Sequence, residues 1–373
     1  MKCRREKCLL LCASVLLAAL LLADGGAQRA ETRCYQMQME AVRLLEECFA
    51  HVRSYKWELG IPIEELDYHG TGMIGESYTG ITTTLGAVEA KRTAAWPEMG
   101  ALCVRMLYEA GIRPGDTVGA GFSGSFPGMN LAVAAACEAM DVRLVCISSV
   151  GASTYGANNE QLTFPEMLHR LKEDGVLQTD STAVTLGGDG DILAEAEPSL
   201  VAEITKRIEA TGLTLLYEPD FSENLRRREG IYQESGPIQC FIAVGGNLSS
   251  MGRGEEGIGL GQGILMPSQS IRLTENSGLV QRYLSNGTTV INLLNLKKIM
   301  SDYSLPYDPE QWPETGISAV YYETQYPLQT IAAGLAVASG LLVAFAWKEK
   351  RERKTPDYMV LLGEGWKNGG KTG

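Results

Sequence analysis

The sequence predicts an α/β protein with a doubly wound, mostly parallel sheet, flanked by an N-terminal signal anchor and a C-terminal transmembrane helix. Two long apolar segments near the ends, each beside basic residues, predict the flanking helices. Between them, short apolar runs alternate with amphipathic helical patterns, which is typical of a parallel sheet with helices on its faces. These runs are continuously apolar, as expected of strands buried on both faces.

The first apolar segment, Cys8–Ala23, follows a basic stretch with four Lys and Arg residues. This order fits an uncleaved membrane anchor. It also fits a cleavable signal peptide with a cleavage site near Ala23 or within 27–30. Both interpretations assign residues 1–29 to the export of the chain that follows, and the sequence leaves the choice between them open.

The second apolar segment, Leu328–Trp347, has the length of about 20 residues that a membrane span requires. Gly334 and Gly340 favour a membrane helix over a buried core helix, because small residues are typical of helix packing in membranes. We expect a transmembrane helix over 326–347 and a basic cytoplasmic tail over 348–373. Since basic flanks favour the cytoplasmic side, both termini are expected inside the cell membrane and the main domain outside it.

The charge distribution excludes one class of partner. The 373 residues carry a net charge of −12, and residues 1–23 and 348–373 each carry +3, so the stretch between them carries −18. Nonspecific nucleic-acid binding needs phosphate-neutralising Lys and Arg side chains, so we expect no nucleic-acid partner. The nine cysteines form no CxxC pair. Buried free thiols, with no metal site and no cofactor, are therefore the prediction.

Residues 30–60 and 61–325 make up the chain between the apolar segments. The first stretch is predicted to contain an amphipathic helix over Glu31–Val52, which either forms a stalk or docks on the globular part. The second is predicted to form the extracytoplasmic α/β domain, beginning with a Gly- and Thr-rich loop over Tyr68–Gly86. The expected strands are Thr117–Gly121, Arg143–Ser148, Thr182–Leu186, Leu213–Tyr217, Ile238–Val244 and Thr288–Leu293, and the expected helices are Pro97–Ala110, Pro127–Met140, Pro165–Glu173, Pro198–Ala210, Phe221–Gln233 and Ser270–Leu284.

Four of the expected strands end in loops rich in Gly, Ser and Asn, over residues 121–130, 148–159, 186–191 and 244–254. In an open parallel sheet, ligands bind outside the carboxyl ends of the strands. One such loop is ordinary turn chemistry, but four at the same edge predict a binding site.

The loop at 121–130 admits two interpretations. Its Gly-Phe-Ser-Gly-Ser start resembles a nucleophile elbow, although Ser125 stands where that motif has its last Gly. The same loop opens a helix whose free N–H groups would bind an anion, and we rank this interpretation first. A nucleophilic Ser123 or Ser125 would need a base, for which the candidates are His69 and Lys91. No P-loop motif is present.

A row of hydroxyls followed by two cations precedes these loops. Thr83 and Thr84 with Lys91 and Arg92 are interpreted as a clamp for a carboxylate or phosphate, or alternatively as a capped helix start with solvated cations. Arg228 and its two basic neighbours are interpreted as a solvated helix face. The complete set of ligand-binding candidates is Thr83, Thr84, Lys91, Arg92, Ser123, Gly124, Ser125, Asn130, Ser149, Asn158, Gly187, Gly188, Gly245, Gly246 and Asn247.

The chain resembles the poly-γ-glutamate system protein family over roughly 65–322. The resemblance rests on TTTLGAVEAKRTAAWPEMGAL (82–102), GFSGSFPGMNLAV (121–133), CISSVGASTYGANN (146–159) and IAVGGN (242–247). It implies membership of a membrane-bound apparatus that makes, exports or processes a γ-linked polyglutamate. It implies poly-γ-glutamate or a γ-glutamyl oligomer, and other membrane components of that machinery, as partners. It assigns no residue a catalytic role.

Two functions follow as expectations. The first is an accessory or binding component of poly-γ-glutamate synthesis or export. The second is a serine-dependent hydrolase or transferase that acts on γ-glutamyl amide bonds. A third, a cytosolic-facing binder of nucleotides or sugar phosphates, would require a topology opposite to that which both basic flanks predict.

Overall fold

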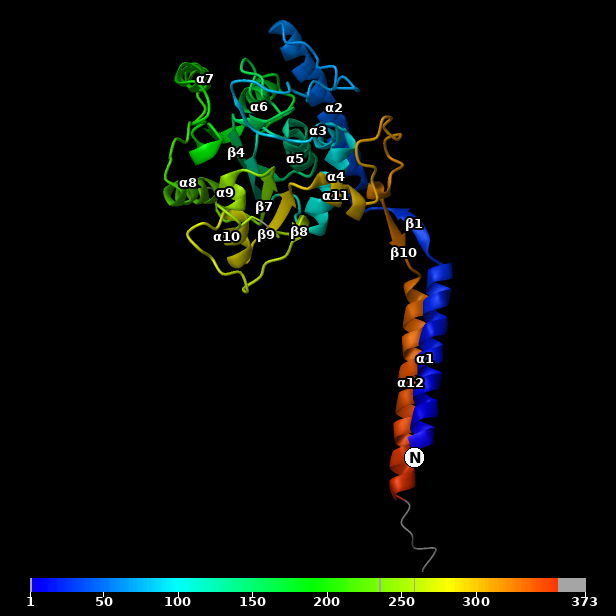
Figure 1. Ribbon diagram of the computed structural model, residues 1–373. Coiled ribbons are helices and arrows are strands. Elements are labelled where there is room, and N and C mark those ends of the chain that lie inside the picture. The colour runs from blue at the N-terminus through cyan, green and yellow to red at the C-terminus, as the bar shows by residue number, and fades with distance from the viewer. Residues whose placement is uncertain (1, 235, 258, 355–373) are drawn as a thin grey trace, which may run out of the picture. The chain divides into compact units, whose positions relative to one another are not determined.

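The computed structural model describes residues 2–234, 236–257 and 259–354 (Figure 1). The chain divides into two compact units. The first combines the residues up to Ala30 with those from Glu323 onward, and the second is Glu31–Tyr322. Of the basic tail expected over 348–373, the part from position 355 lies outside the described residues.

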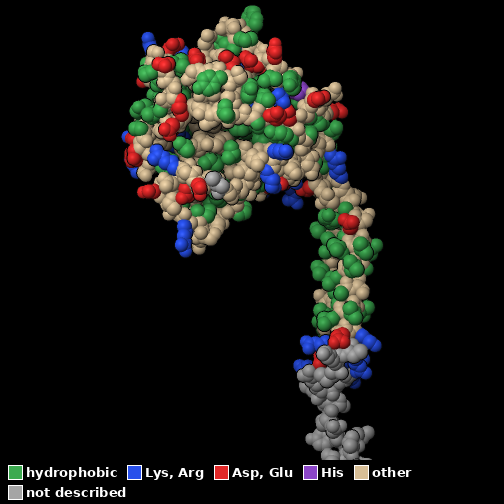
Figure 2. Space-filling model, in the orientation of Figure 1, with side chains coloured by type: hydrophobic (Ala, Val, Ile, Leu, Met, Phe, Trp, Pro, Cys, Tyr) green, Lys and Arg blue, Asp and Glu red, His purple; other side chains and the backbone are tan. Residues whose placement is uncertain are grey.

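The first unit is a pair of long helices, α1 (Lys2–Gly25) and α12 (Leu328–Lys354), that lie side by side. Both are long and apolar enough, by length and composition, to cross a membrane. Hydrophobic side chains cover the pair, and Lys and Arg side chains gather at the end that carries the N-terminus (Figure 2). Next to the helices, β1 (Gln28–Glu31) and β10 (Tyr322–Gln325) form a two-stranded sheet.

Small side chains line the contact between α1 and α12. A Cβ built on Gly334 would lie 2.3 Å from the Ala19 Cβ, so only glycine allows this approach. One turn further along α12, the Ala338 carbonyl lies 3.7 Å from the Cys12 Sγ. Residue numbers therefore rise along one helix as they fall along the other, and the two helices are antiparallel.

The second unit is built on a six-stranded sheet with the strand order β6-β4-β3-β7-β9-β8. The first five strands are parallel, and β8 is antiparallel to β9. Their bounds are β3 (Thr117–Phe122), β4 (Arg143–Ser149), β6 (Ser181–Thr185), β7 (Cys240–Val244), β8 (Gly263–Leu265) and β9 (Thr289–Leu293). A separate parallel pair is formed by β2 (Thr82–Thr84) and β5 (Ala152–Ser153).

Successive residues of the central strands enter different hydrophobic clusters. In β7, Ile242 belongs to the largest cluster, which includes α2, α4, α5 and α6, whereas Phe241 belongs to a second cluster with α8 and α10. Val184 of β6 packs with α7 in a third cluster. The helices are α2 (Tyr35–Glu58), α3 (Val88–Ala94), α4 (Glu98–Glu109), α5 (Pro127–Ala139), α6 (Phe164–Glu173), α7 (Pro198–Ala210), α8 (Phe221–Gln233), α9 (Leu248–Met251), α10 (Leu279–Ser285) and α11 (Leu296–Asp302), with short 3-10 turns η1 (Asp189–Asp191) and η2 (Ala319–Tyr321).

The helix expected over 30–60 is α2, and it docks on the domain rather than forming a stalk. Leu45, Phe49 and Val52 are buried in the largest cluster against α4 and α5. Its apolar face is therefore part of the core, and the compact unit begins at Glu31.

Two expected elements differ in the structure. Within the described residues, Leu213–Tyr217 makes one isolated bridge, between Leu215 and Val184 of β6, and forms no strand. The helix expected over Ser270–Leu284 begins only at Leu279. The segment before it is held in an irregular form, since Thr274 and Ser277 donate hydrogen bonds to the Glu256 carboxylate. The antiparallel edge strand β8 was not expected.

Candidate functional site

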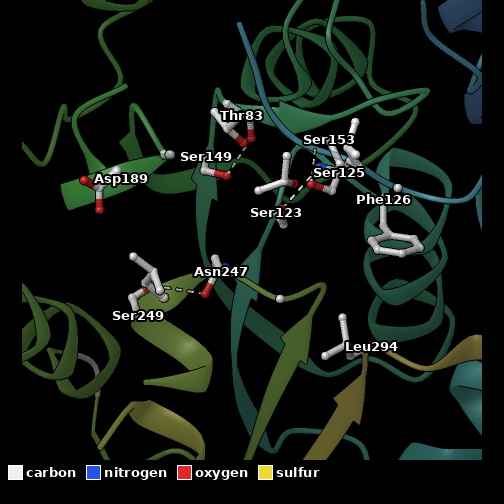
Figure 3. Close-up of a pocket in the computed structure, with 18 of the residues that line it drawn as sticks. Thr83, Ser123, Ser125, Phe126, Ser149, Ser153, Asp189, Asn247, Ser249 and Leu294 are labelled. Carbon is white, nitrogen blue, oxygen red and sulfur yellow. Dashed lines mark hydrogen bonds between the residues drawn. The ribbon is translucent and has the colours of Figure 1, made fainter. Parts of the chain in front are cut away.

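A cavity of about 550 Å³ opens at the carboxyl ends of the parallel strands (Figure 3). The loops after β3, β4, β6 and β7 line it, together with the segment that joins β2 to α3. These are the four Gly-rich loops that the sequence places at one sheet edge. Ten of the candidate residues line the cavity: Thr83, Thr84, Lys91, Ser123, Ser125, Ser149, Gly187, Gly188, Gly246 and Asn247.

The cavity lies where the strand order changes direction. After β3, the chain places β4 next to one edge of β3 and then β6 beyond β4. It then crosses back and places β7 next to the other edge of β3. The loop after β3 contacts the end of β7 here: the Ser123 N–H donates to the carbonyl of Val244, the last residue of β7, at 3.3 Å. Gly245 has a φ of +79°, and a Cβ there would lie 2.9 Å from the Ser123 Cβ. Such a crevice is the usual ligand site of open parallel sheets.

The serines of the cavity form a connected row. The Ser123 Oγ accepts the Ser125 N–H at 3.2 Å, and the Ser125 Oγ accepts the Ser153 N–H at 2.9 Å (Figure 3). The Ser149 Oγ accepts the Gly124 N–H at 3.2 Å. Within the described part of the chain, neither Ser123 nor Ser125 donates a hydroxyl hydrogen bond. Both hydroxyl protons are therefore free to bind an acceptor in the cavity.

Lys91 is the cation of this site. Its side chain is only 3% exposed, and burial lowers the pKa of its ammonium to about 7. Among the described residues, the ammonium forms no hydrogen bond and no ion pair. Lys56 is equally buried, but its ammonium donates to the Ile74 carbonyl at 3.2 Å. A buried ammonium without a partner is costly, so Lys91 favours an anion in the cavity.

The surroundings of Lys91 fix its position. Its Nζ lies 3.6 Å from the centre of the Phe126 ring, and Phe126 is the N-cap residue that precedes α5. No side chain of the described residues caps this helix, and a helix N-terminus favours negative charge. A Cβ built on Gly86 would lie 2.8 Å from the Ser153 Oγ and 3.2 Å from the Lys91 Cε. The lysine and the serine row therefore meet at Gly86.

Acidic residues line the opposite side of the cavity. Asp189 and Glu195 are exposed, and the Glu195 carboxylate accepts the Asp189 N–H at 3.0 Å. Asp191 is held differently, by an ion pair with Arg228 and a 2.9 Å hydrogen bond from Asn224. Arg228 is 2% exposed, so the interpretation of a solvated face is wrong for this residue. Its guanidinium is turned inward by the Asp191 carboxylate.

Several candidate residues do not line the cavity. Arg92 forms an ion pair with Asp308, with an Nε–Oδ1 distance of 2.8 Å. His69 stacks on Trp312 with ring centres 3.9 Å apart, and is not among the residues around the serines. These contacts give both side chains structural partners.

The remaining candidates support the loops from behind. The Asn130 Nδ2 donates to the Ser123 carbonyl at 2.8 Å, and Asn130 is fully buried. The Asn158 Nδ2 donates to the Glu76 carbonyl at 2.9 Å. Gly124 packs against the backbone of the loop after β4, because a Cβ there would lie 2.9 Å from the Gly151 carbonyl. With Gly245, these residues position the site without lining it.

Phe126, Ser153 and Glu195 are among the cavity residues that sequence reasoning missed. Phe126 and Ser153 lie within two of the Gly-rich loops, but only other residues of those loops were selected as candidates. Glu195 lies beyond the Gly-rich stretch, so no local signal identifies it. Among the described residues, no group of three or more His, Cys, Asp or Glu side chains is arranged to hold a metal ion.

Comparison of the chain with protein-family models, with curated proteins and with solved structures finds no significant match.

Proposed function

We propose that this protein is a membrane-anchored accessory component of poly-γ-glutamate synthesis or export, and that its α/β domain binds a γ-glutamyl chain in the cavity. The observation that carries the binding function is Lys91, a buried ammonium that has no hydrogen-bond or ion-pair partner among the described residues and shares the cavity with the Ser123 and Ser125 hydroxyls. The polymer is assigned from the resemblance of four segments to the poly-γ-glutamate family.

The chemistry of the ligand matches that of the cavity. Each unit of a γ-linked polyglutamate carries an α-carboxylate, which would pair with the Lys91 ammonium. The Ser123 and Ser125 hydroxyls would donate to the same carboxylate or to the next amide carbonyl. The net charge of −18 between the ends repels a polyanion at long range, so binding depends on these short contacts.

The fold supports this position for a ligand. We assign the domain to the doubly wound class, because one set of helices packs on one side of the sheet and α8 and α10 pack in a different cluster. In that class, the crevice between the loops after the first strand and the strand across the switch point is the binding site. Here these loops follow β3 and β7.

We further propose that α1 is retained as a membrane helix beside α12. If α1 and α12 span one bilayer as an antiparallel pair, the N-terminal end of α1 and the C-terminal end of α12 lie on the same side of the membrane. Glu31–Tyr322, which connects the two helices, would then lie on the other side. The basic residues beside both helices would place those ends in the cytoplasm and the domain outside. Digestion of intact cells with an added protease tests this topology: only an exported domain is cut before the cells are broken.

Isothermal titration of the full chain in detergent with a γ-linked glutamate tetramer tests the binding function. We expect saturable heat for the native chain and at least a tenfold loss of affinity in Lys91→Met. Lys297→Met is the control, because Lys297 is an exposed lysine of α11 outside the cavity. No saturable heat with the native chain would contradict the proposal.

A serine-dependent γ-glutamyl amide hydrolase or transferase is the second candidate. The observation that favours it is the pKa of about 7 for Lys91, which leaves about half of this amine neutral at pH 7, in the same cavity as Ser123 and Ser125. That amine would take the hydroxyl proton as the serine oxygen attacks the amide carbonyl. The resulting ammonium would then protonate the leaving nitrogen, and water or an amine would cleave the ester.

Mass spectrometry of the polymer after incubation with the protein separates the two functions. Shortened chains or newly formed amides that disappear in Ser123→Ala or Ser125→Ala would identify an enzyme. Unchanged polymer together with saturable binding supports the accessory function. We rank the accessory function first because both serine oxygens are held as acceptors of backbone N–H groups, and no described bond joins them to Lys91.

A further inference from the structure

The cavity has two ends of opposite charge. At the buried end, the Lys91 ammonium lies against Phe126 and has no anionic partner among the described residues. At the exposed end are the carboxylates of Asp189 and Glu195. Figure 3 shows Asp189 and Phe126 on opposite sides of Ser123 and Ser149. A ligand that carries only negative charge would match one end and be repelled by the other.

The acidic end of the cavity carries negative charge that the protein does not neutralise within the described residues. Asp191 is neutralised by Arg228, so it does not contribute. Within the described ranges, neither Asp189 nor Glu195 forms an ion pair, and the only hydrogen bond that Glu195 accepts comes from the Asp189 N–H. These two carboxylates therefore favour a cation at the mouth of the cavity, just as Lys91 favours an anion inside it.

The segment Thr83–Gly86 connects the two ends. A Cβ built on Gly188 would lie 2.6 Å from the Glu195 Oε2 and 3.0 Å from the Thr83 Cγ2, so Thr83 borders the acidic end. Gly86 borders the Lys91 Cε at the other end. Three residue steps separate Thr83 from Gly86, which is at most about 10 Å of backbone. A ligand that carries both an ammonium and a carboxylate offers a charge of the matching sign to each end of the cavity.

We infer that the cavity recognises an α-amino acid head, with the carboxylate at Lys91 and the ammonium at Asp189 and Glu195. This inference rests on the proposed function and specifies which part of the polymer binds. In a γ-linked chain, the first unit alone has a free α-ammonium beside its α-carboxylate. Interior units present a carboxylate and an amide, and the last unit presents two carboxylates. The ligand is therefore the amino end of the chain.

The acidic end supplies selectivity by repulsion as well as by attraction. The two carboxylates of the last unit would place a negative charge against Asp189 and Glu195, which costs binding free energy. An acetylated amino end would leave both side chains without a cation. The domain would thus hold one defined end of the polymer and leave the rest of the chain free for the partners that extend or export it.

Titration of the full chain in detergent with four probes tests this inference. The probes are a γ-linked glutamate tetramer, the same tetramer acetylated at its amino end, the tetramer amidated at its carboxyl end, and free L-glutamate. We expect acetylation to weaken binding at least tenfold and amidation to change it less than threefold. Free L-glutamate, which has the head group without the polymer, is expected to bind more weakly than the tetramer.

Two variants locate the contact. Asp189→Asn combined with Glu195→Gln is expected to lower affinity for the native tetramer tenfold and to leave or raise affinity for the acetylated one. Lys297→Met is the control and should keep the preference for the free amino end. Since Asp189 and Glu195 are exposed, their replacement should not disturb folding, which the thermal unfolding temperature checks.

The outcomes separate this inference from the proposed function. Equal affinity for the acetylated and the free tetramer would overturn the inference and leave polymer binding in place. L-glutamate that binds as tightly as the tetramer would overturn the assignment to a polymer end. No binding of any probe would overturn both the inference and the proposed function.

Discussion

The Lys91 ammonium lies 3.6 Å from the centre of the Phe126 ring, and this contact is its only described partner. An aromatic face offsets part of the cost of burying a cation, by roughly 0.5–2 kcal/mol, but it accepts no strong hydrogen bond. The ammonium therefore stays available to an anion. The pKa of about 7 reports the same balance, since burial is its only cause.

Ligand affinity is expected to fall as the pH rises from about 6 to about 9. Below a pH of about 7 the free protein already carries the Lys91 ammonium. Above it, a bound carboxylate requires proton uptake, so affinity falls about tenfold per pH unit until the pKa of the complex is reached. Titration calorimetry in two buffers with different ionisation enthalpies would detect that uptake. A flat profile, or one that persists in Lys91→Met, would refute this assignment.

Removing the buried ammonium is expected to stabilise the protein. Because burial lowers the pKa of Lys91 in the folded chain, the unfolded chain binds more protons between a pH of about 7 and about 10. The burial of the Lys91 ammonium therefore lowers the free energy of unfolding by its full amount below a pH of about 7. This loss shrinks as the pH rises toward 10. Lys91→Met should raise the thermal unfolding temperature at neutral pH, by several degrees, and lose this advantage at high pH. An unchanged or lower unfolding temperature at neutral pH would contradict the prediction.

Gly86→Ala is expected to weaken ligand binding about tenfold with little loss of stability. The new Cβ would lie 2.8 Å from the Ser153 Oγ and 3.2 Å from the Lys91 Cε, and both side chains would have to shift. These are side-chain atoms that can move, so the fold should tolerate the change. Gly230→Ala in α8 is the matched control, because a Cβ there meets nothing within 4 Å. Calorimetry and thermal unfolding of both variants check this; equal affinities would exclude Gly86 from the site.

Ala338→Cys is expected to form a disulfide with Cys12 under mild oxidation, because the Cys12 Sγ lies 3.7 Å from the Ala338 carbonyl. After proteolysis between the two helices, the fragments should stay joined on a non-reducing gel. Adding Gly334→Leu should abolish the link by separating the helices, since even a Cβ at 334 would lie 2.3 Å from the Ala19 Cβ. Gly340→Leu is the control, with nothing within 4 Å of its Cβ. A protein that lacks α1 would show no link at all.

Local patterns were sufficient for much of the fold. The strands β3, β4, β6, β7 and β9 were located because each is a short apolar run between turn residues, and that signal is carried by neighbouring residues. Leu213–Tyr217 has the same pattern but makes a single bridge, because only the neighbouring strand decides whether an apolar run is paired. The edge strand β8 has three residues, too few for a periodic signal.

The candidate site divides in the same way. The local sequence by itself determined that Gly- and Ser-rich loops follow several of the strands. Because these strands are parallel, the loops lie at one edge of the sheet. Lys91 and Arg92 are adjacent in sequence and equivalent by composition. Only the tertiary structure separates them. Asp308, more than two hundred residues away, neutralises Arg92, whereas Lys91 is buried against Phe126 and has no counter-ion in the part of the chain that the structure describes. Burial and pairing depend on contacts distant in sequence, and these decide which charge is available to a ligand.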